Sequence, residues 1–192
     1  MLMLPKSRLG LLLACGLLAL SAGRANAEKL KVCATVPDLG SLVIEVGGDE
    51  VSVTVFGKGQ EDPHFIEAKP SFIKATSEAD MFVELGMEME IGYAPLLLGN
   101  ARNSRVLQNG PGFVDASRAI TPIELPSGSV DRSMGDVHAA GNPHYLLDPI
   151  NGLKVAALLR DKLVELRPEK KDYFDARYSD FRKRLGNALV GE

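Results

Sequence analysis

The sequence contains few of the residues and motifs that most enzymes and disulfide-rich secreted proteins use. It has no tryptophan, two cysteines and three histidines among 192 residues. It also lacks a Gly-x-Ser-x-Gly motif, a phosphate-binding Gly-Lys-Ser/Thr loop and a Cys-x-x-Cys pair. These absences exclude the common serine-hydrolase, nucleotide-binding and redox motifs. The three histidines are therefore the main candidates for chemistry.

Residues 1–27 have the pattern of an export signal. A positively charged start is followed by a short apolar run from Leu9 to Ala22, and Ala25-Asn26-Ala27 has the small-x-small form of a cleavage site. The run is shorter than the roughly 20 apolar residues of a membrane-spanning helix. Cys15 lies inside the run, so a lipid anchor is only a minor alternative. We expect a periplasmic or otherwise extracytoplasmic protein.

Cleavage of this signal would make the chain more acidic. Lys6, Arg8 and Arg24 would be removed, and the net charge would change from −3 to −6. An acidic protein has no electrostatic attraction for nucleic acid or anionic membranes, so we expect neither as a partner. Cys33 would be the one remaining cysteine, which excludes an intrachain disulfide. Its apolar surroundings predict a small buried side chain in a strand.

Strand and helix patterns alternate along the first half of the chain. Apolar periodicity predicts strands at 30–36, 51–56 and 81–85, and helices at 38–46, 70–75 and 89–98. Later segments are predicted as short strands at 113–115 and 120–125, and as helices at 149–166 and from Pro168 onward. The alternation predicts an α/β fold, a doubly wound lobe with a mainly parallel sheet and helices on both faces.

The last predicted helix has a single apolar stripe on an otherwise charged surface. The stripe comprises Phe174, Tyr178, Phe181, Leu185 and Leu189, at spacings of three and four. Such a stripe must pack against something, and each large apolar side chain left uncovered forgoes roughly 1.5–3 kcal/mol of burial. We expect only partial cover, and therefore fraying or self-association through this C-terminal helix.

The three histidines lie in loops or at the ends of elements. His64 follows a predicted parallel strand, and doubly wound folds bind ligands at the ends of such strands. His64 and His144 each follow a proline, and His138 lies six residues before His144 in the apolar-poor loop 126–142. Imidazole is a good ligand for zinc and its neighbours in the first transition series. We predict that His64 and His144 bind a metal ion, with His138 as an optional third ligand.

Nearby carboxylates are weaker candidates. Four of them could hold imidazole rings in place through hydrogen bonds: Glu61, Asp62, Glu67 and Asp136. Glu88 and Glu90 are predicted to open a helix, where the helix dipole favours acidic residues, and are interpreted as structural.

Several short motifs occur in a fixed order along residues 36–149. They are Val-Pro-Asp-Leu (36–39), Val-Gly-Gly-Asp (46–49), Asp-Pro-His (62–64), Lys-Pro-Ser (69–71), Ala-Asp (79–80), the turn 86–90 and Asn-Pro-His-Tyr-Leu-Leu-Asp-Pro (142–149). Together they resemble the metal-specific solute-binding proteins of bacterial ABC importers, the zinc- and manganese-binding group called cluster A-I. The resemblance extends over nearly all of residues 28–190.

The resemblance implies a role and a site. His64 and His144 match the two histidine ligands that the family takes from its N-terminal lobe, and the loop with His138 is most similar to the zinc-binding branch. The implied function is capture of Zn²⁺, or of Mn²⁺, for a membrane permease. The family has two lobes joined by a long helix. We expect residues 28–166 to form the N-terminal lobe and 167–192 the linking helix, without the second lobe, as in a truncated form.

Two other functions remain open. Three histidines and a water are a known catalytic zinc arrangement, in which Glu67 or Asp136 would act as the base of a hydrolase. No His-Glu-x-x-His motif supports this interpretation. A purely structural fragment that binds no metal is the other alternative.

Overall fold

The computed structural model describes residues 28–128, 130, 135 and 137–191, so the expected export signal and Asp136 lie outside the described residues. Four strands form one sheet in the order β2-β1-β3-β4, and every neighbouring pair is parallel. The strands are β1 (Leu30–Ala34), β2 (Val51–Val55), β3 (Met81–Glu84) and β4 (Phe113–Asp115). The predicted parallel α/β fold is confirmed.

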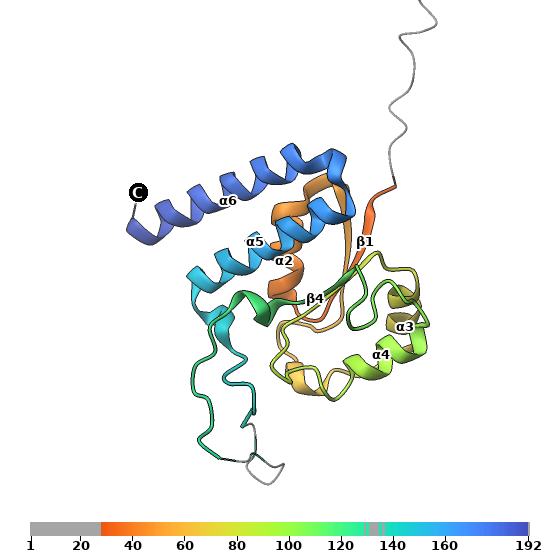
Figure 1. Cartoon of the computed structure of the whole chain (residues 1–192). Helices are drawn as coiled ribbons and strands as arrows, with labels where there is room; N and C mark the ends of the chain where they lie inside the picture. Colours follow the sequence, from red (N-terminus) through yellow and green to blue (C-terminus); the bar gives the residue numbers. More distant parts are fainter. Residues whose placement is uncertain (1–27, 129, 131–134, 136, 192) are drawn as a thin grey trace, which may run out of the picture.

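Helices cover both faces of the sheet (Figure 1). On one face lie α2 (Pro37–Gly47), α5 (Pro149–Leu166) and α6 (Lys171–Val190), and on the other α3 (Pro70–Ser77) and α4 (Ala94–Ala101). Proline stands in the first turn of α2, α3, α4 and α5, where the missing N–H has no intrahelical partner to lose. Among the described helices, none has the length and apolar character needed to cross a membrane.

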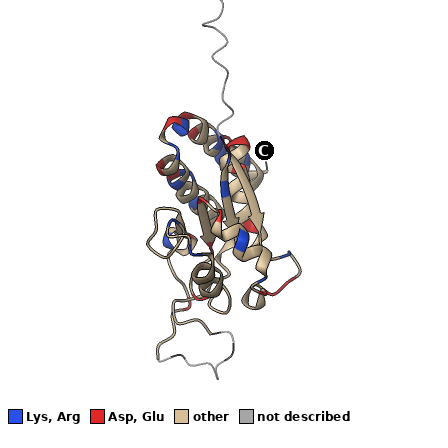
Figure 2. Cartoon of the chain, turned by 90° about the vertical axis from the view of Figure 1, so that its right-hand side faces the viewer, with Lys and Arg blue, Asp and Glu red and all other residues tan. Residues whose placement is uncertain are grey.

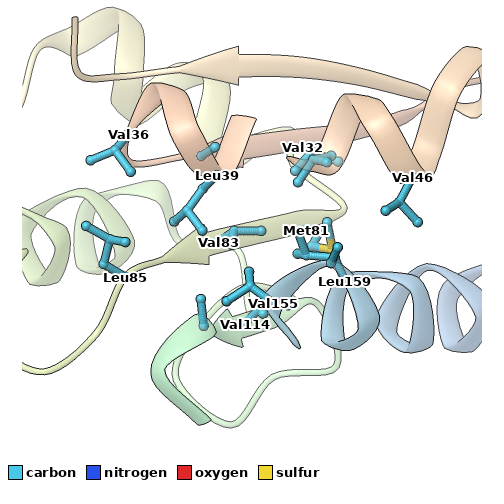
Figure 3. Close-up of a cluster of buried hydrophobic side chains, with 14 of the residues drawn as sticks. Val32, Val36, Leu39, Val46, Met81, Val83, Leu85, Val114, Val155 and Leu159 are labelled. Atoms are coloured by element: carbon cyan, nitrogen blue, oxygen red, sulfur yellow. The ribbon is translucent and has the colours of Figure 1, made fainter. Parts of the chain in front are cut away.

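Alternation along the strands divides the core into two layers. Val32 and Ala34 of β1 face α2 and α5, whereas Cys33 between them faces α3 and α4. The larger layer is drawn in Figure 3, where Leu39 from α2 and Leu159 from α5 approach the sheet. Both leucines are fully buried, and each contributes about 1.5–3 kcal/mol. Cys33 is a free, buried thiol as expected, and burial raises its pKa to about 12.

The apolar stripe of α6 is covered in part, with its first residue buried and Leu189 near its end 49% exposed. Phe174 is completely buried, and Tyr178 and Phe181 pack half-buried against the larger core layer. Arg177 reinforces this docking, because its guanidinium donates to the Glu45 carbonyl at the end of α2. Less apolar surface of α6 is therefore exposed than if the whole stripe were uncovered, which weakens the reason to expect fraying or self-association. Charged residues line the solvent side of these helices (Figure 2).

Two secondary-structure predictions are wrong. Residues 89–98 do not form one helix: turns occupy 87–93, and α4 begins only at Ala94. Met87 and Glu88, directly before this segment, have positive φ, so the chain enters it from a left-handed turn and not from a helix. Residues 120–125 form no strand in this described segment, which follows a 3₁₀ turn after β4. Pro122 lacks the N–H that a strand within a sheet would donate.

A row of acidic side chains lies at the carboxyl end of the sheet. Glu84 of β3 pairs in register with Asp115 of β4. Burial, and then the negative charges of Glu90 and Asp115, raise the pKa of Glu84 from 4.5 to about 8. The folded chain therefore keeps a proton on Glu84 that the unfolded chain loses near pH 4.5. This contribution to stability is complete below about pH 4.5 and is lost as pH rises through about 8.

Glu84→Gln should remove most of that pH dependence. Glutamine stays neutral at every pH, so the variant should match the wild type near about pH 5 and be the more stable of the two near about pH 9. Chemical denaturation at both pH values measures the difference. Glu169→Gln, at an exposed position, is the control and should leave the slope unchanged. Equal slopes for wild type and Glu84→Gln would contradict the assignment.

Candidate metal centre

His64 lies just beyond the carboxyl end of β2, in the 3₁₀ turn Pro63–Phe65. The Asp62 carboxylate caps this turn by accepting from the His64 backbone N–H at 2.9 Å. The same oxygen lies 2.7 Å from Nδ1 of the imidazole. A carboxylate only accepts, so the proton of neutral His64 is held on Nδ1 and the Nε2 lone pair is free. His64 is thus oriented as a metal ligand through Nε2.

His144 approaches the same place from far along the chain. The Asn142 side chain accepts from the His144 backbone N–H at 2.9 Å, and Pro143 restricts the backbone between them. The next residue, Tyr145, is buried and its hydroxyl donates to the Leu85 carbonyl at the end of β3 at 2.7 Å. The ring centroids of His64 and His144 lie 6.2 Å apart, edge to face. The two prolyl-histidine motifs therefore meet.

His138 makes the closest contact with His64. Their Nε2 atoms are 3.1 Å apart, and their rings stack with centroids 5.2 Å apart and an angle of 24°. Burial, followed by the neighbouring His64 ring, lowers the pKa of His138, so His138 stays neutral at a lower pH than usual. The sequence placed His138 third in importance, but it lies nearer to His64 than His144 does.

The spacing of two imidazole nitrogens suits a transition metal, but a complete set of ligands is not gathered among the residues that the structure describes. Two nitrogens bound to one tetrahedral Zn²⁺ at about 2.0–2.1 Å lie about 3.3–3.4 Å apart, close to the observed separation of the two Nε2 atoms. Across the described part of the chain, no three His, Cys, Asp or Glu side chains are already gathered as one ligand set. His64 and His138 are thus the two imidazoles whose facing nitrogens have nearly the separation of two ligands of one ion, and the ring of His144 lies beside that of His64.

The predicted carboxylates have different surroundings. Asp62 holds His64 as described, and that contact lowers the pKa of Asp62, with the His64 backbone N–H as the main cause. Glu61 instead accepts from the Lys58 backbone N–H at 3.0 Å. Glu67 is exposed and has no hydrogen bond to a histidine within the described residues. Asp136 lies outside them.

Sequence reasoning missed Glu88 and Glu90. Neither opens a helix: Glu88 accepts from the Ala139 backbone N–H at 3.1 Å, directly after His138. Glu90 is buried beneath the turn that carries Glu88. The sequence indicated a turn at 86–90, but nothing in it connected that turn to a loop about fifty residues later. A cavity of about 650 Å³ adjoins the site, and His64, His138 and Glu88 are among the residues that line it.

Comparisons with known proteins agree with this fold. The family described as the periplasmic component A of the zinc-uptake complex, ZnuA, matches residues 32–188. The manganese ABC transporter substrate-binding lipoprotein PsaA of Streptococcus pneumoniae is 27% identical over 173 residues, which cover 88% of this chain and 53% of PsaA. The manganese-binding lipoprotein MntA of Halalkalibacterium halodurans is 30% identical over 151 residues, 79% of this chain and 44% of MntA.

Solved structures give the same result. A zinc-bound deletion mutant of ZnuA superimposes with a TM-score of 0.68 at 27% identity, over 83% of this chain and 55% of that one. A manganese-bound periplasmic metal-binding protein from Candidatus Liberibacter asiaticus has the same TM-score at 18% identity, over 85% and 55% of the two chains, and supports the fold alone.

The chain spans about half the length of the curated relatives it matches. These relatives are substrate-binding components of transporters and not enzymes, so the three-histidine hydrolase that the sequence left open is not supported. The family match covers most of the chain, including all three histidines and the strands β2, β3 and β4. The chain belongs to the ZnuA family of metal-binding, substrate-binding proteins of ABC transporters.

Proposed function

We propose that this chain is the metal-binding lobe of an exported receptor that captures a divalent transition metal, preferentially Zn²⁺, for an ABC importer. The observation that carries the proposal is the pair of imidazole nitrogens, on His64 and His138, that face one another at 3.1 Å. Two lone pairs at this separation repel unless a cation or a proton lies between them. Asp62 keeps the His64 proton on the opposite side of its ring, so Nε2 of His64 offers a lone pair that can accept either the proton of His138 or a cation.

The preference for zinc follows from the donor atoms. All three candidate ligands are imidazoles, which suit Zn²⁺, whereas Mn²⁺ favours carboxylate, carbonyl and water oxygens. A manganese receptor is the second candidate, and it is favoured by relatives such as PsaA and MntA that are named for manganese. Competition between the two ions at one site distinguishes these alternatives.

The proposal also includes the organisation and location of the chain. Residues 1–27 are a cleaved export signal, 28–166 form the metal-binding lobe and 167–192 form the linking helix. The protein then acts outside the cytoplasm, and its partner is the membrane permease of the importer. Two relatives are lipoproteins, so mass spectrometry of the exported N-terminus is the direct test between a cleaved soluble form and an anchored one.

Removing the ligands should remove binding. Isothermal titration of residues 28–192 with Zn²⁺ should give one site. His64→Ala and His144→Ala should each weaken it by more than the roughly 10–100-fold that the loss of an outer-shell partner costs. His138→Ala should cost less, because holding its long loop in place offsets part of what this ligand contributes. Glu61→Ala is the control, since Glu61 bonds Lys58 instead of a histidine. Unchanged affinity in all three histidine variants would refute the site.

Binding should weaken in acid. Imidazole ligates only when neutral, so the affinity for Zn²⁺ should fall as pH drops through about 6.5. Because burial lowers the pKa of His138, its contribution should persist to lower pH than that of an ordinary exposed histidine. Titrations from about pH 8 to pH 5 measure both effects. An affinity that is flat over this range would exclude histidine ligands.

Asp62→Asn should weaken Zn²⁺ binding by about 10–100-fold. The amide still caps the 3₁₀ turn but no longer offers a charged acceptor to Nδ1 of His64. ¹⁵N NMR of the metal-free protein should therefore show less of the tautomer with the proton on Nδ1. Glu61→Gln removes an equal charge one residue away and should change neither quantity. Wild-type affinity in Asp62→Asn would show that this carboxylate does not orient His64.

A further inference from the structure

An unusual left-handed turn lies beside the metal centre. Gly86, Met87 and Glu88 are consecutive and have φ values of 79°, 51° and 67°. Glycine adopts this conformation freely, but methionine and glutamate do so at a steric cost. Two strained residues in succession persist only where the surrounding structure requires them, and such strain is concentrated at functional sites.

The buried carboxylate of Glu90 holds the start of this turn in place. It accepts from the backbone N–H groups of Leu85 at 2.7 Å and Gly86 at 3.1 Å. The Thr35 hydroxyl at the end of β1 also donates to it, at 2.7 Å. A side chain at Gly86 would collide with the Asp115 carboxylate, since an added Cβ would lie 2.0 Å from its oxygen. The turn is therefore tied to the ends of three strands.

The strained residues face the loop that carries His138. Glu88 accepts from the Ala139 backbone N–H at 3.1 Å, and the Met87 backbone lies near the His138 ring. Consecutive residues of the turn thus contact consecutive residues of the loop. With these contacts formed, Nε2 of His138 lies 3.1 Å from Nε2 of His64. In a right-handed turn, Glu88 would point in another direction and this contact would be lost.

We propose that Glu88 is a positioning residue that latches the His138 loop to the metal centre and thereby sets the preference for Zn²⁺ over Mn²⁺. The inference rests on the proposed metal-binding function. With the latch formed, the ion can meet three imidazole nitrogens; without it, His64 and His144 supply two. Each added nitrogen favours Zn²⁺ more than Mn²⁺, because manganese gains less from imidazole.

A double-mutant cycle between Glu88 and His138 tests the latch. In residues 28–192, Glu88→Ala should weaken Zn²⁺ binding about as much as His138→Ala does, while Mn²⁺ binding changes less. Glu88→Ala should have no further effect in a His138→Ala background, because the residue then has no ligand to position. Glu88→Gln keeps an acceptor oxygen and should restore most of the affinity. Glu67→Ala is the charge-matched control, since Glu67 is exposed and three residues after His64.

Glu88→Gly separates positioning from stability. Glycine relieves the positive φ but removes the carboxylate, so the variant should melt at the same or a higher temperature and still bind Zn²⁺ more weakly. Two results would overturn the latch in favour of a charge effect. One is that Glu88→Ala lowers the affinity for Zn²⁺ equally in the presence and absence of His138. The other is that Glu67→Ala lowers this affinity as much as Glu88→Ala does. If Glu88→Ala keeps the wild-type affinity for Zn²⁺ while His64→Ala still loses it, the latch is overturned and the proposed function stands. Zinc binding that does not depend on His64 would overturn both.

Discussion

The buried carboxylate of Glu90 connects the fold to the metal centre. It joins the end of β1, through the Thr35 hydroxyl, to the end of β3, through two backbone N–H groups. Burial raises the pKa of Glu90, and these three donors oppose the rise. A carboxylate that is 2% exposed is costly unless its oxygens are hydrogen-bonded, so the turn after β3 must keep the geometry that supplies the donors. The left-handed conformation of Met87 and Glu88 follows from that requirement.

The parallel sheet explains why distant histidines meet. All four strands run in the same direction, so the segments that follow them leave the sheet at one edge. His64 follows β2, the turn with Glu88 follows β3, and Tyr145 ties the segment of His144 to the end of β3. A binding site built from such segments can be rigid on one side and mobile on the other. Here the Asp62 carboxylate fixes the ring of His64, whereas His138 is held by the contact between Glu88 and the backbone of Ala139.

Helices α5 and α6, at the end of the chain, stabilise the sheet by packing with α2 over one of its faces. Phe174 of α6 enters the core between α2 and α5, and Arg177 satisfies carbonyl groups at the end of α2. Arg167 and Lys170, before α6, also pair with Glu50 near the start of β2. Helix α6 is therefore packed against the lobe. The metal site lies at the other edge of the sheet, where these contacts do not reach.

The sequence alone determined the α/β class, the parallel sheet and the two prolyl-histidine motifs. Periodicity of apolar residues indicates strands and helices locally, and proline and aspartate mark where helices such as α5 begin. The sequence did not reveal the left-handed turn, the pairing of His138 with His64 or the contact of Glu88 with the residue after His138. Those features depend on contacts between residues about fifty to seventy positions apart, and on a buried carboxylate whose partners are backbone groups of other segments. Only the tertiary structure brings these groups within hydrogen-bonding distance, so it alone decided which of the three histidines lie together.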